Sequence, residues 1–140
     1  MIKKYLIIFS VLIILPSNLF SKNQYFQEGV NLFKNNKFNE AKFKFEQDIV
    51  FNPKNERSYL YLSMIFNNLK KTDLEEQNLK TVILLNPKNE EAIYYLARLK
   101  LDLSDYKRSK ELNNKLLDFC DKFCVKSQKL KIEIEKLSKQ

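Results

Sequence analysis

The sequence contains no histidine and no tryptophan, and its one glycine is Gly29. Histidine is the side chain that most often serves as a general base, and it is also a common metal ligand. A single glycine leaves no glycine-rich loop that could hold a phosphate group. These absences exclude the usual catalytic and cofactor-binding patterns. We therefore expect a protein that is not an enzyme and that holds no cofactor and no metal.

Proline is also scarce, with 3 residues in 140. Glycine and proline are the main residues of turns, so their scarcity disfavours a turn-rich β architecture and favours helices. After the N-terminal segment described next, ~119 residues remain, enough for one domain with its own core. We expect a single all-α domain.

The first 21 residues have the composition of a secretory signal peptide. Lys3 and Lys4 give a short basic start, residues 5–15 are almost all apolar, and residues 16–21 read as a cleavage region. The apolar run is shorter than the ~20 residues that a membrane-spanning helix needs, which favours cleavage after Ser21 over an uncleaved anchor. The chain is expected to be exported, to the periplasm or the outer face of the cytoplasmic membrane.

The formal charge is +8, and most of the basic residues are lysine, because arginine occurs only at Arg57, Arg98 and Arg108. The lysines are spread along the chain, whereas nucleic-acid-binding proteins usually cluster their basic residues on one element. We therefore expect no nucleic-acid partner. Peripheral attachment to an anionic lipid or polymer through the lysine-rich surface stays open as an alternative function.

One five-residue phrase occurs twice in the chain. Asn52–Glu56 reads Asn-Pro-Lys-Asn-Glu and Asn86–Glu90 repeats it, so that the two prolines are 34 residues apart. Self-similarity at a fixed period indicates stacked units that cannot bury their apolar faces alone. The chain then divides into three frames and a last segment, at residues 22–55, 56–89, 90–123 and 124–140.

Each frame has the pattern of two amphipathic helices joined by a short polar turn. In the duplicated phrase the proline ends one helix, and Asn55 or Asn89 is placed to cap the next. Thr72 and Glu75 have the spacing of a capping box, in which Glu75 would accept from the Thr72 amide.

The last segment, residues 124–140, has the pattern of an amphipathic helix. Leu130, Ile134 and Leu137 recur at helical spacing among lysines and glutamates. The ends of a stacked repeat array need such a helix with a polar outer face, so we expect this segment to cap the third frame.

These features resemble the tetratricopeptide repeat, which has a period of ~34 residues. The family places a small residue in each helix of a pair, large apolar residues around them, and a proline near the end. Matching residues are Tyr25, Gly29, Leu32, Phe38, Ala41, Phe45 and Pro53, then Tyr59, Ser63, Phe66, Leu79 and Pro87, then Ile93, Ala97 and Tyr106. Thr72, Glu75, Lys100, Asn113 and Asp121 depart from the pattern. The resemblance implies a right-handed α-solenoid of three helix pairs and a capping helix.

In this family the first helix of each pair lines a concave groove that binds a peptide or helix of a partner protein. The corresponding residues here are Phe26, Val30, Phe33, Leu60, Tyr61, Met64, Tyr94, Tyr95 and Arg98. Some relatives hold a C-terminal carboxylate with Lys and Asn side chains, but Phe26 and Val30 stand at those positions. The resemblance therefore implies an apolar, aromatic groove with one cation, although aromatic residues at helical spacing also serve as core.

The predicted partner is another envelope or secreted protein. The chain itself is expected to be monomeric or to associate weakly with itself through stacked repeats.

Cys120 and Cys124 are the only cysteines. An even number of cysteines in an exported chain favours a disulfide, which would join the end of the third frame to the last helix. Two free thiols, or a redox or metal-binding pair, are the alternatives.

Overall fold

The computed structural model describes residues 24–139, which form seven α-helices and no strand. The helices are α2 (Gln24–Lys34), α3 (Phe38–Phe51), α4 (Glu56–Asn68), α5 (Thr72–Leu85), α6 (Glu90–Asp102), α7 (Tyr106–Leu117) and α8 (Cys124–Leu137). The all-α prediction is confirmed. The predicted signal peptide lies outside the described residues, and none of the described helices is long and apolar enough to span a bilayer.

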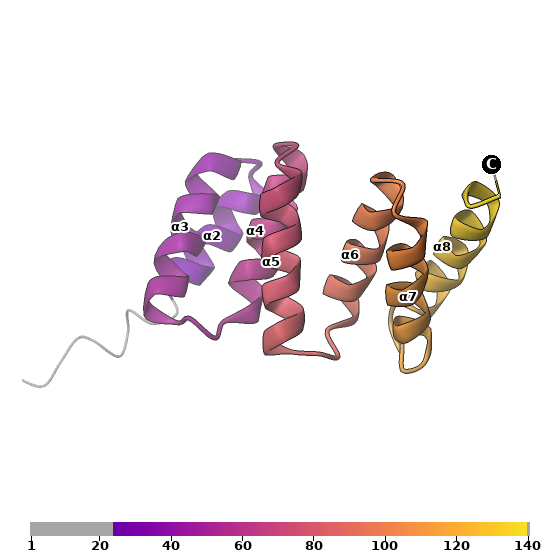
Figure 1. Cartoon of the computed structure of the whole chain (residues 1–140). Coiled ribbons are helices and arrows are strands. Elements are labelled where there is room, and N and C mark those ends of the chain that lie inside the picture. Colours follow the sequence, from indigo (N-terminus) through magenta and orange to yellow (C-terminus); the bar gives the residue numbers. More distant parts are fainter. Residues whose placement is uncertain (1–23, 140) are drawn as a thin grey trace, which may run out of the picture.

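The helices are arranged as three antiparallel pairs, α2 with α3, α4 with α5 and α6 with α7, stacked one after another (Figure 1). Neighbouring pairs meet through α3 with α4 and through α5 with α6. Helix α8 packs on α7, touches α6, and forms the C-terminal end of the stack. The predicted helical solenoid is confirmed. Helices α4, α6 and α8 begin at Glu56, Glu90 and Cys124, the first residues of three predicted segments.

The two helices of each pair are joined by the same backbone turn. Asn36, Lys70 and Ser104 have φ angles of 59°, 56° and 61°, a left-handed conformation that usually selects glycine. The N–H groups of the following residues donate to carbonyls of the preceding helix, in the bonds Lys37 to Leu32, Lys71 to Phe66 and Asp105 to Lys100. Such bonds close the C-terminal turn of a helix. The chain therefore makes three tight helix-ending turns without glycine.

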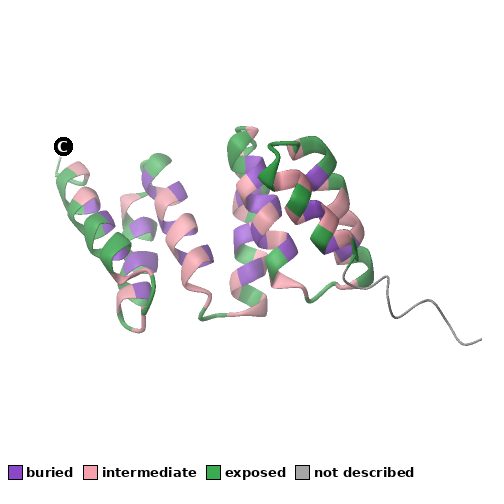
Figure 2. Ribbon diagram, turned by 180° about the vertical axis from the view of Figure 1, so that it is seen from behind, coloured by how far each residue is buried: buried purple, intermediate pink, exposed green. Residues whose placement is uncertain are grey.

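The core consists of two apolar clusters, and α4 contributes to both. Figure 2 shows that buried residues occur along the helices of the whole stack. The first lies between the first two pairs and contains Phe26, Ala41, Phe45, Leu62, Ile65 and Phe66. The second runs from the second pair to α8 and includes Leu60, Leu79, Val82, Ile93, Leu96, Leu116, Leu130 and Ile134. Leu130 and Ile134 are buried as the capping prediction requires. Since α4 contributes to both clusters, it couples the two halves of the stack.

Gly29 allows α2 to pack closely on α3. A Cβ atom at this position would lie 2.8 Å from Cε1 of Phe45, closer than carbon atoms normally approach. Phe45 is fully buried and stacks on Tyr61 with a ring separation of 4.9 Å. Because Phe45 is held from both sides, it cannot easily move away from a larger side chain at position 29.

The duplicated phrase links successive pairs through side-chain hydrogen bonds. In the second copy, Asn86 and Asn89 both donate to the Glu56 carboxylate, at 3.1 and 3.4 Å. The next carboxylate along the stack, Glu90, accepts from the backbone N–H groups of Asp121 and Phe123 at 3.0 and 2.8 Å. Glu56 and Glu90 are the first residues of α4 and α6. Each therefore binds the segment that follows its own helix pair and leads to the next helix of the stack.

Of the predicted helix caps, one is confirmed and two do not form. Asn89 caps α6 as predicted, because its side chain accepts from the Ala92 N–H at 2.9 Å. Asn55 makes no side-chain cap bond and instead donates to the buried Asp48 at 2.7 Å. The predicted capping box of Thr72 and Glu75 is wrong, since α5 has no side-chain cap bond and Glu75 accepts from Asn67 of α4. In both cases a partner on the neighbouring helix replaces a local one.

Candidate functional site: a hollow between α4 and α6

A hollow of about 440 Å³ opens between α4 and α6, and we call it the α4–α6 hollow. Its lining residues are Phe33 from α2, Ser63, Met64, Asn67 and Asn68 from α4, Glu75 from α5, and Tyr95, Arg98, Leu99 and Asp102 from α6. This volume is within the ~300–1,000 Å³ range of ligand sites. Four helices from all three pairs therefore build one concavity.

One part of the hollow is apolar and aromatic. The Phe33 ring stands edge-on to Tyr61 at 5.1 Å, which fixes its orientation at the end of α2. Met64 and Tyr95 are half-buried, each packed against the second core cluster, and Leu99 is buried. Met64 is flexible, so it can adapt its shape to a bound side chain.

Arg98 is the predicted cation of the site, but carboxylates of its own chain already surround it. Its guanidinium pairs with Glu133 of α8, and its Nε lies 3.7 Å from the Asp102 carboxylate. The ion pair with Glu133 also joins α8 to α6 over a long sequence separation. Most of the positive charge of Arg98 is therefore balanced before any partner binds.

Glu75 lies at the place where the first and third repeats have the small residues Ala41 and Ser109. It is only 7% exposed, and each of its carboxylate oxygens accepts from the Asn67 side chain at 3.1 Å. Burial raises the pKa of the Glu75 carboxyl, and the charge of Asp102 raises it further, while the Asn67 hydrogen bond and the charge of Lys70 act in the opposite direction. Helices α4 and α5 are in close contact although this carboxylate lies between them, and Asn67 of α4 donates to it.

The nine predicted groove residues fall into three groups. Four line the α4–α6 hollow: Phe33, Met64, Tyr95 and Arg98. Val30, Tyr61 and Tyr94 are half-buried and do not line it, although Tyr61 contacts Phe33 and Tyr94 contacts Tyr95. Phe26 and Leu60 are 4% and 9% exposed. The prediction is corrected for the last two, which belong to the core and have little surface to offer a partner. Phe26 packs on Phe45 and Tyr61, with the Arg57 guanidinium 4.6 Å above its ring.

Tyr94 lies on the side of α6 that faces α8. Its ring is 5.6 Å from that of Tyr95 and 5.4 Å from that of Phe123. The Lys126 ammonium lies over both Tyr94 and Phe123, at 5.8 and 4.6 Å. Tyr94 therefore continues the aromatic surface from the hollow toward α8.

Sequence reasoning missed the polar half of the hollow, which consists of Asn67, Asn68, Glu75 and Asp102. Glu75 carried a signal, because a carboxylate stood where the repeat pattern has a small residue. The sequence analysis noted this departure from the repeat pattern without linking it to the site, whereas in the structure Glu75 lines the hollow. Asn67, Asn68 and Asp102 stand at helix ends, where no sequence pattern distinguishes them.

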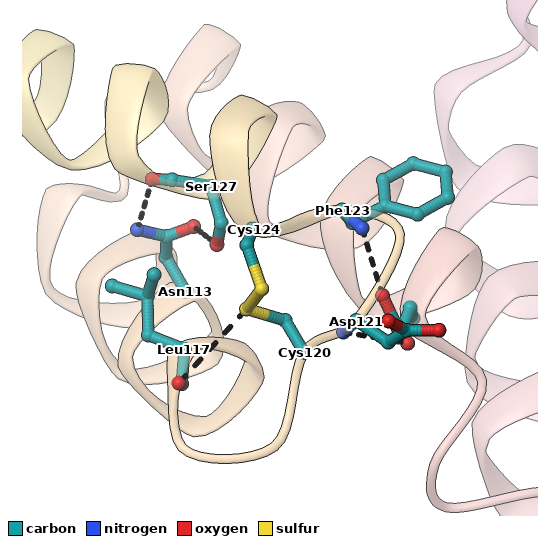
Figure 3. The surroundings of a disulfide bond; sticks show 8 residues. Asn113, Leu117, Cys120, Asp121, Phe123, Cys124 and Ser127 are labelled. Carbon is teal, nitrogen blue, oxygen red and sulfur yellow. Dashed lines mark hydrogen bonds between the residues drawn. A yellow bond between two sulfur atoms is a disulfide. The ribbon is translucent and has the colours of Figure 1, made fainter.

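A disulfide joins Cys120, in the loop after α7, to Cys124, the first residue of α8 (Figure 3). Beside it, Asn113 donates to the Ser127 carbonyl at 3.0 Å and accepts from the Ser127 hydroxyl at 2.6 Å. Asn113, which departs from the repeat pattern, thus joins α7 to α8 through these two hydrogen bonds. Within residues 24–139 no group of three or more His, Cys, Asp or Glu side chains could hold a metal ion.

The fold and this concavity define a tetratricopeptide-repeat architecture, and comparison with solved structures shows the same fold. No protein-family model matches the chain, and no curated protein is significantly similar to it. The first tetratricopeptide domain of Spaghetti (RPAP3), bound to the HSP90 peptide SRMEEVD, superposes with a TM-score of 0.77 at 15% identity, over 86% of this chain and 97% of that one.

Two further structures show how widely this fold is shared. The tetratricopeptide domain of Arabidopsis OM64 has a TM-score of 0.73 at 20% identity, over 86% of this chain and 98% of that one. The type III secretion chaperone SycD of Yersinia enterocolitica, in complex with a peptide of the translocator YopD, has a TM-score of 0.77 at 16% identity, over 91% and 99% of the two chains. At such identities the likeness concerns the fold.

Proposed function

We propose that this chain is an exported, non-enzymatic interaction module that binds a peptide segment of an envelope or secreted protein in the α4–α6 hollow. The observation that carries the proposal is the hollow itself, in which Phe33, Met64 and Tyr95 present a partly exposed apolar and aromatic surface. The similar domains of RPAP3 and SycD bind peptides, which supports the same use of this fold here.

Export is supported by features at both ends of the chain. Residues 1–21 have the composition of a signal peptide. The disulfide between Cys120 and Cys124 is of a kind that persists in oxidising compartments. Expression with residues 1–21 intact, followed by mass measurement of the periplasmic protein, tests this part. A mature chain starting at Lys22 supports it, and a full-length chain found only in the cytoplasm contradicts it.

The binding function is tested by capture of partners from solubilised envelope. The wild-type chain is compared with Met64→Ala/Tyr95→Ala, which removes apolar surface from the hollow, and with Phe43→Ala/Leu84→Ala, which removes exposed apolar surface from α3 and α5. We expect a discrete protein that is retained by wild type and by the second variant and lost from the first. Thermal unfolding of each variant shows whether its fold persists. Equal retention by all three would contradict binding in the hollow.

The alternative is attachment to an anionic lipid or polymer, and the surface of α8 favours it. Val125 and Ile132 are 69% and 67% exposed and lie among Lys126, Lys129 and Lys131. Charge attraction of this kind is screened over ~10 Å at 0.1 M salt, so it weakens steeply as salt rises. Binding to anionic vesicles that disappears at high salt and in Lys129→Gln/Lys131→Gln, with no protein captured, would favour this function.

A further inference from the structure

The α4–α6 hollow contains more negative than positive charge. Glu75 and Asp102 supply two carboxylates, and Arg98 supplies one guanidinium. Glu133, just outside the lining, takes up much of the Arg98 charge. The hollow is thus locally acidic in a chain whose formal charge is +8.

The charge of Glu75 has no cationic partner among the described ion pairs. Glu75 is 93% buried by the neighbouring helices, and the Asn67 amide donates to both oxygens of its carboxylate. A neutral amide can donate to a carboxylate but cannot balance its charge. The carboxylate stays in the hollow wall without an ion-pair partner, although the charge of Lys70 acts on it from further away. The adjacent Glu76 has two such partners, Lys80 at 2.6 Å and Lys100 at 2.8 Å.

The apolar and acidic parts of the hollow lie beside each other. Tyr95, Leu99 and Asp102 follow one another along the same helix, and Met64 stands one turn before Asn67 and Asn68 on the facing helix. A ligand that fills the whole hollow must therefore offer an apolar group next to a hydrogen-bond donor with positive charge. In a peptide, these groups are an apolar side chain beside a lysine or arginine.

We infer that the α4–α6 hollow selects peptide segments in which a lysine or arginine lies next to an apolar residue, an inference that rests on the proposed peptide-binding function. The cation contacts Glu75 and Asp102. The apolar side chain packs among Phe33, Met64 and Tyr95. This preference is opposite in charge to the acidic peptide SRMEEVD held by the similar RPAP3 domain.

The net charge of the chain makes this inference testable. Cleavage after Ser21 would remove Lys3 and Lys4 and leave a formal charge of +6. A chain of this charge repels basic peptides at long range, so any preference for them has to come from local contacts. A single neutralising substitution in the hollow should then abolish the preference, whereas the same substitution elsewhere should not.

The experiment selects binders from a random peptide library on three forms of the exported chain: wild type, Glu75→Gln and Glu40→Gln. Glu40 is an exposed residue of α3 that is paired with Lys37, so it provides the same chemical change outside the hollow. We expect wild type and Glu40→Gln to enrich peptides with a basic residue at one position beside an apolar one. Glu75→Gln should keep the apolar preference and lose the basic one.

A synthetic peptide from the wild-type selection then gives the size of the effect by fluorescence anisotropy. Replacing its basic residue by glutamine should weaken binding to wild type by about tenfold or more, as expected for a hydrogen bond to a charged group. The same replacement should change binding to Glu75→Gln by less than about threefold. Asp102→Asn should give a smaller loss in the same direction, since Asp102 is more exposed and shares Arg98.

The outcomes separate this inference from the function on which it rests. Enrichment of apolar peptides without a basic residue would overturn the charge preference and leave peptide binding in place. Enrichment of acidic peptides would overturn it too, and would assign Arg98 as the contact. No enrichment on any form, with the fold intact by circular dichroism, would overturn both.

Discussion

The two copies of the duplicated phrase pack over different side chains, and the difference shows what the phrase contributes. We call residues 52–55 the first link and residues 86–89 the second link. The first link lies over the buried pair Asp48 and Ser58, and the second lies over Val82 and Ala92, which occupy the same places one repeat later. The same five-residue sequence therefore packs over a polar pair at the first link and over an apolar pair at the second.

The asparagines of each link find different partners as a result. In the first link the side chains of Asn52 and Asn55 donate to Asp48, at 3.0 and 2.7 Å, and the Ser58 hydroxyl donates to the same carboxylate at 2.5 Å. In the second link both asparagines donate to Glu56 of the preceding pair. The phrase thus supplies donors, and its surroundings decide which carboxylate accepts.

The largest expected effect comes from placing a carboxylate under the second link. In Val82→Asp the new charge would be fully buried beside Ala92, without the hydroxyl that Asp48 has from Ser58. Asn86 and Asn89 already donate to Glu56, so the new charge gains no free donor, and burying it costs about 4 kcal/mol, a large part of the stability of a small domain. Urea unfolding followed by far-UV circular dichroism measures the loss. Leu84→Asp is the matched control, because Leu84 is 81% exposed on the same helix and should change stability by less than about 0.5 kcal/mol.

The reverse change should have a smaller effect. Asp48→Val removes the shared acceptor and leaves the buried Ser58 hydroxyl without the carboxylate, at a cost of about 2 kcal/mol. The double variant Asp48→Val/Ser58→Ala copies the second link and should be more stable than the single variant, because both members of the buried polar pair are then apolar. If the double variant is the less stable of the two by urea unfolding, the links differ by more than this pair.

The helices themselves could be predicted from sequence, because their signals are local. The prolines of the phrase, the polar turns and the helical spacing of apolar residues led to seven helices and to starts at Glu56, Glu90 and Cys124. These signals depend on backbone chemistry within a few residues. They do not depend on which helix becomes the neighbour.

The site could be predicted only in part, because its polar contacts cross between helices. The resemblance to a known repeat pointed to Phe33, Met64, Tyr95 and Arg98, which line the hollow. It also pointed to Phe26 and Leu60, since helical spacing cannot separate a core face from a groove face one residue away. Glu75 was assigned a local cap, although its partner Asn67 stands eight residues away on α4.

The third link, residues 118–123, replaces the phrase by a covalent clip. It has no proline or asparagine at the corresponding places, and the Cys120–Cys124 disulfide closes it instead. Cys120→Ser/Cys124→Ser should lower the free energy of unfolding by about 2 kcal/mol, because the unfolded chain regains the freedom that the loop removed. Reduction of the wild-type chain should lower it equally.

Amide exchange gives a local test of the same clip. The N–H groups of Asp121 and Phe123 donate to Glu90, and they should exchange faster once the loop is open. Unchanged exchange at both positions, together with unchanged stability, would mean that the hydrogen bonds to Glu90 hold this link without the disulfide.

The smallest expected effect on stability comes from Glu75. The second helix pair has this carboxylate where the first and third pairs have the small residues Ala41 and Ser109. Because burial raises the pKa of Glu75 in the folded chain, the folded state holds this proton more tightly than the unfolded state. The ionised carboxylate therefore destabilises the fold at neutral pH, and this penalty disappears as the pH falls below the value for an unfolded glutamate. Glu75→Gln should raise the free energy of unfolding at pH 7 by less than about 1 kcal/mol, and the gain should vanish near pH 4.

The neighbouring Glu76 provides a control of opposite sign. The Lys100 and Lys80 ammonium groups hold its pKa below the usual range, so its ionised form stabilises the fold, and that stability is lost as the pH falls through the folded pKa. Glu76→Gln should therefore lower stability at pH 7, with the loss shrinking toward acid pH. Urea unfolding of wild type and both variants across this range compares the two residues directly. Parallel curves for Glu75→Gln and Glu76→Gln would mean that ionised Glu75 stabilises the fold as ionised Glu76 does, which would contradict a raised pKa for Glu75.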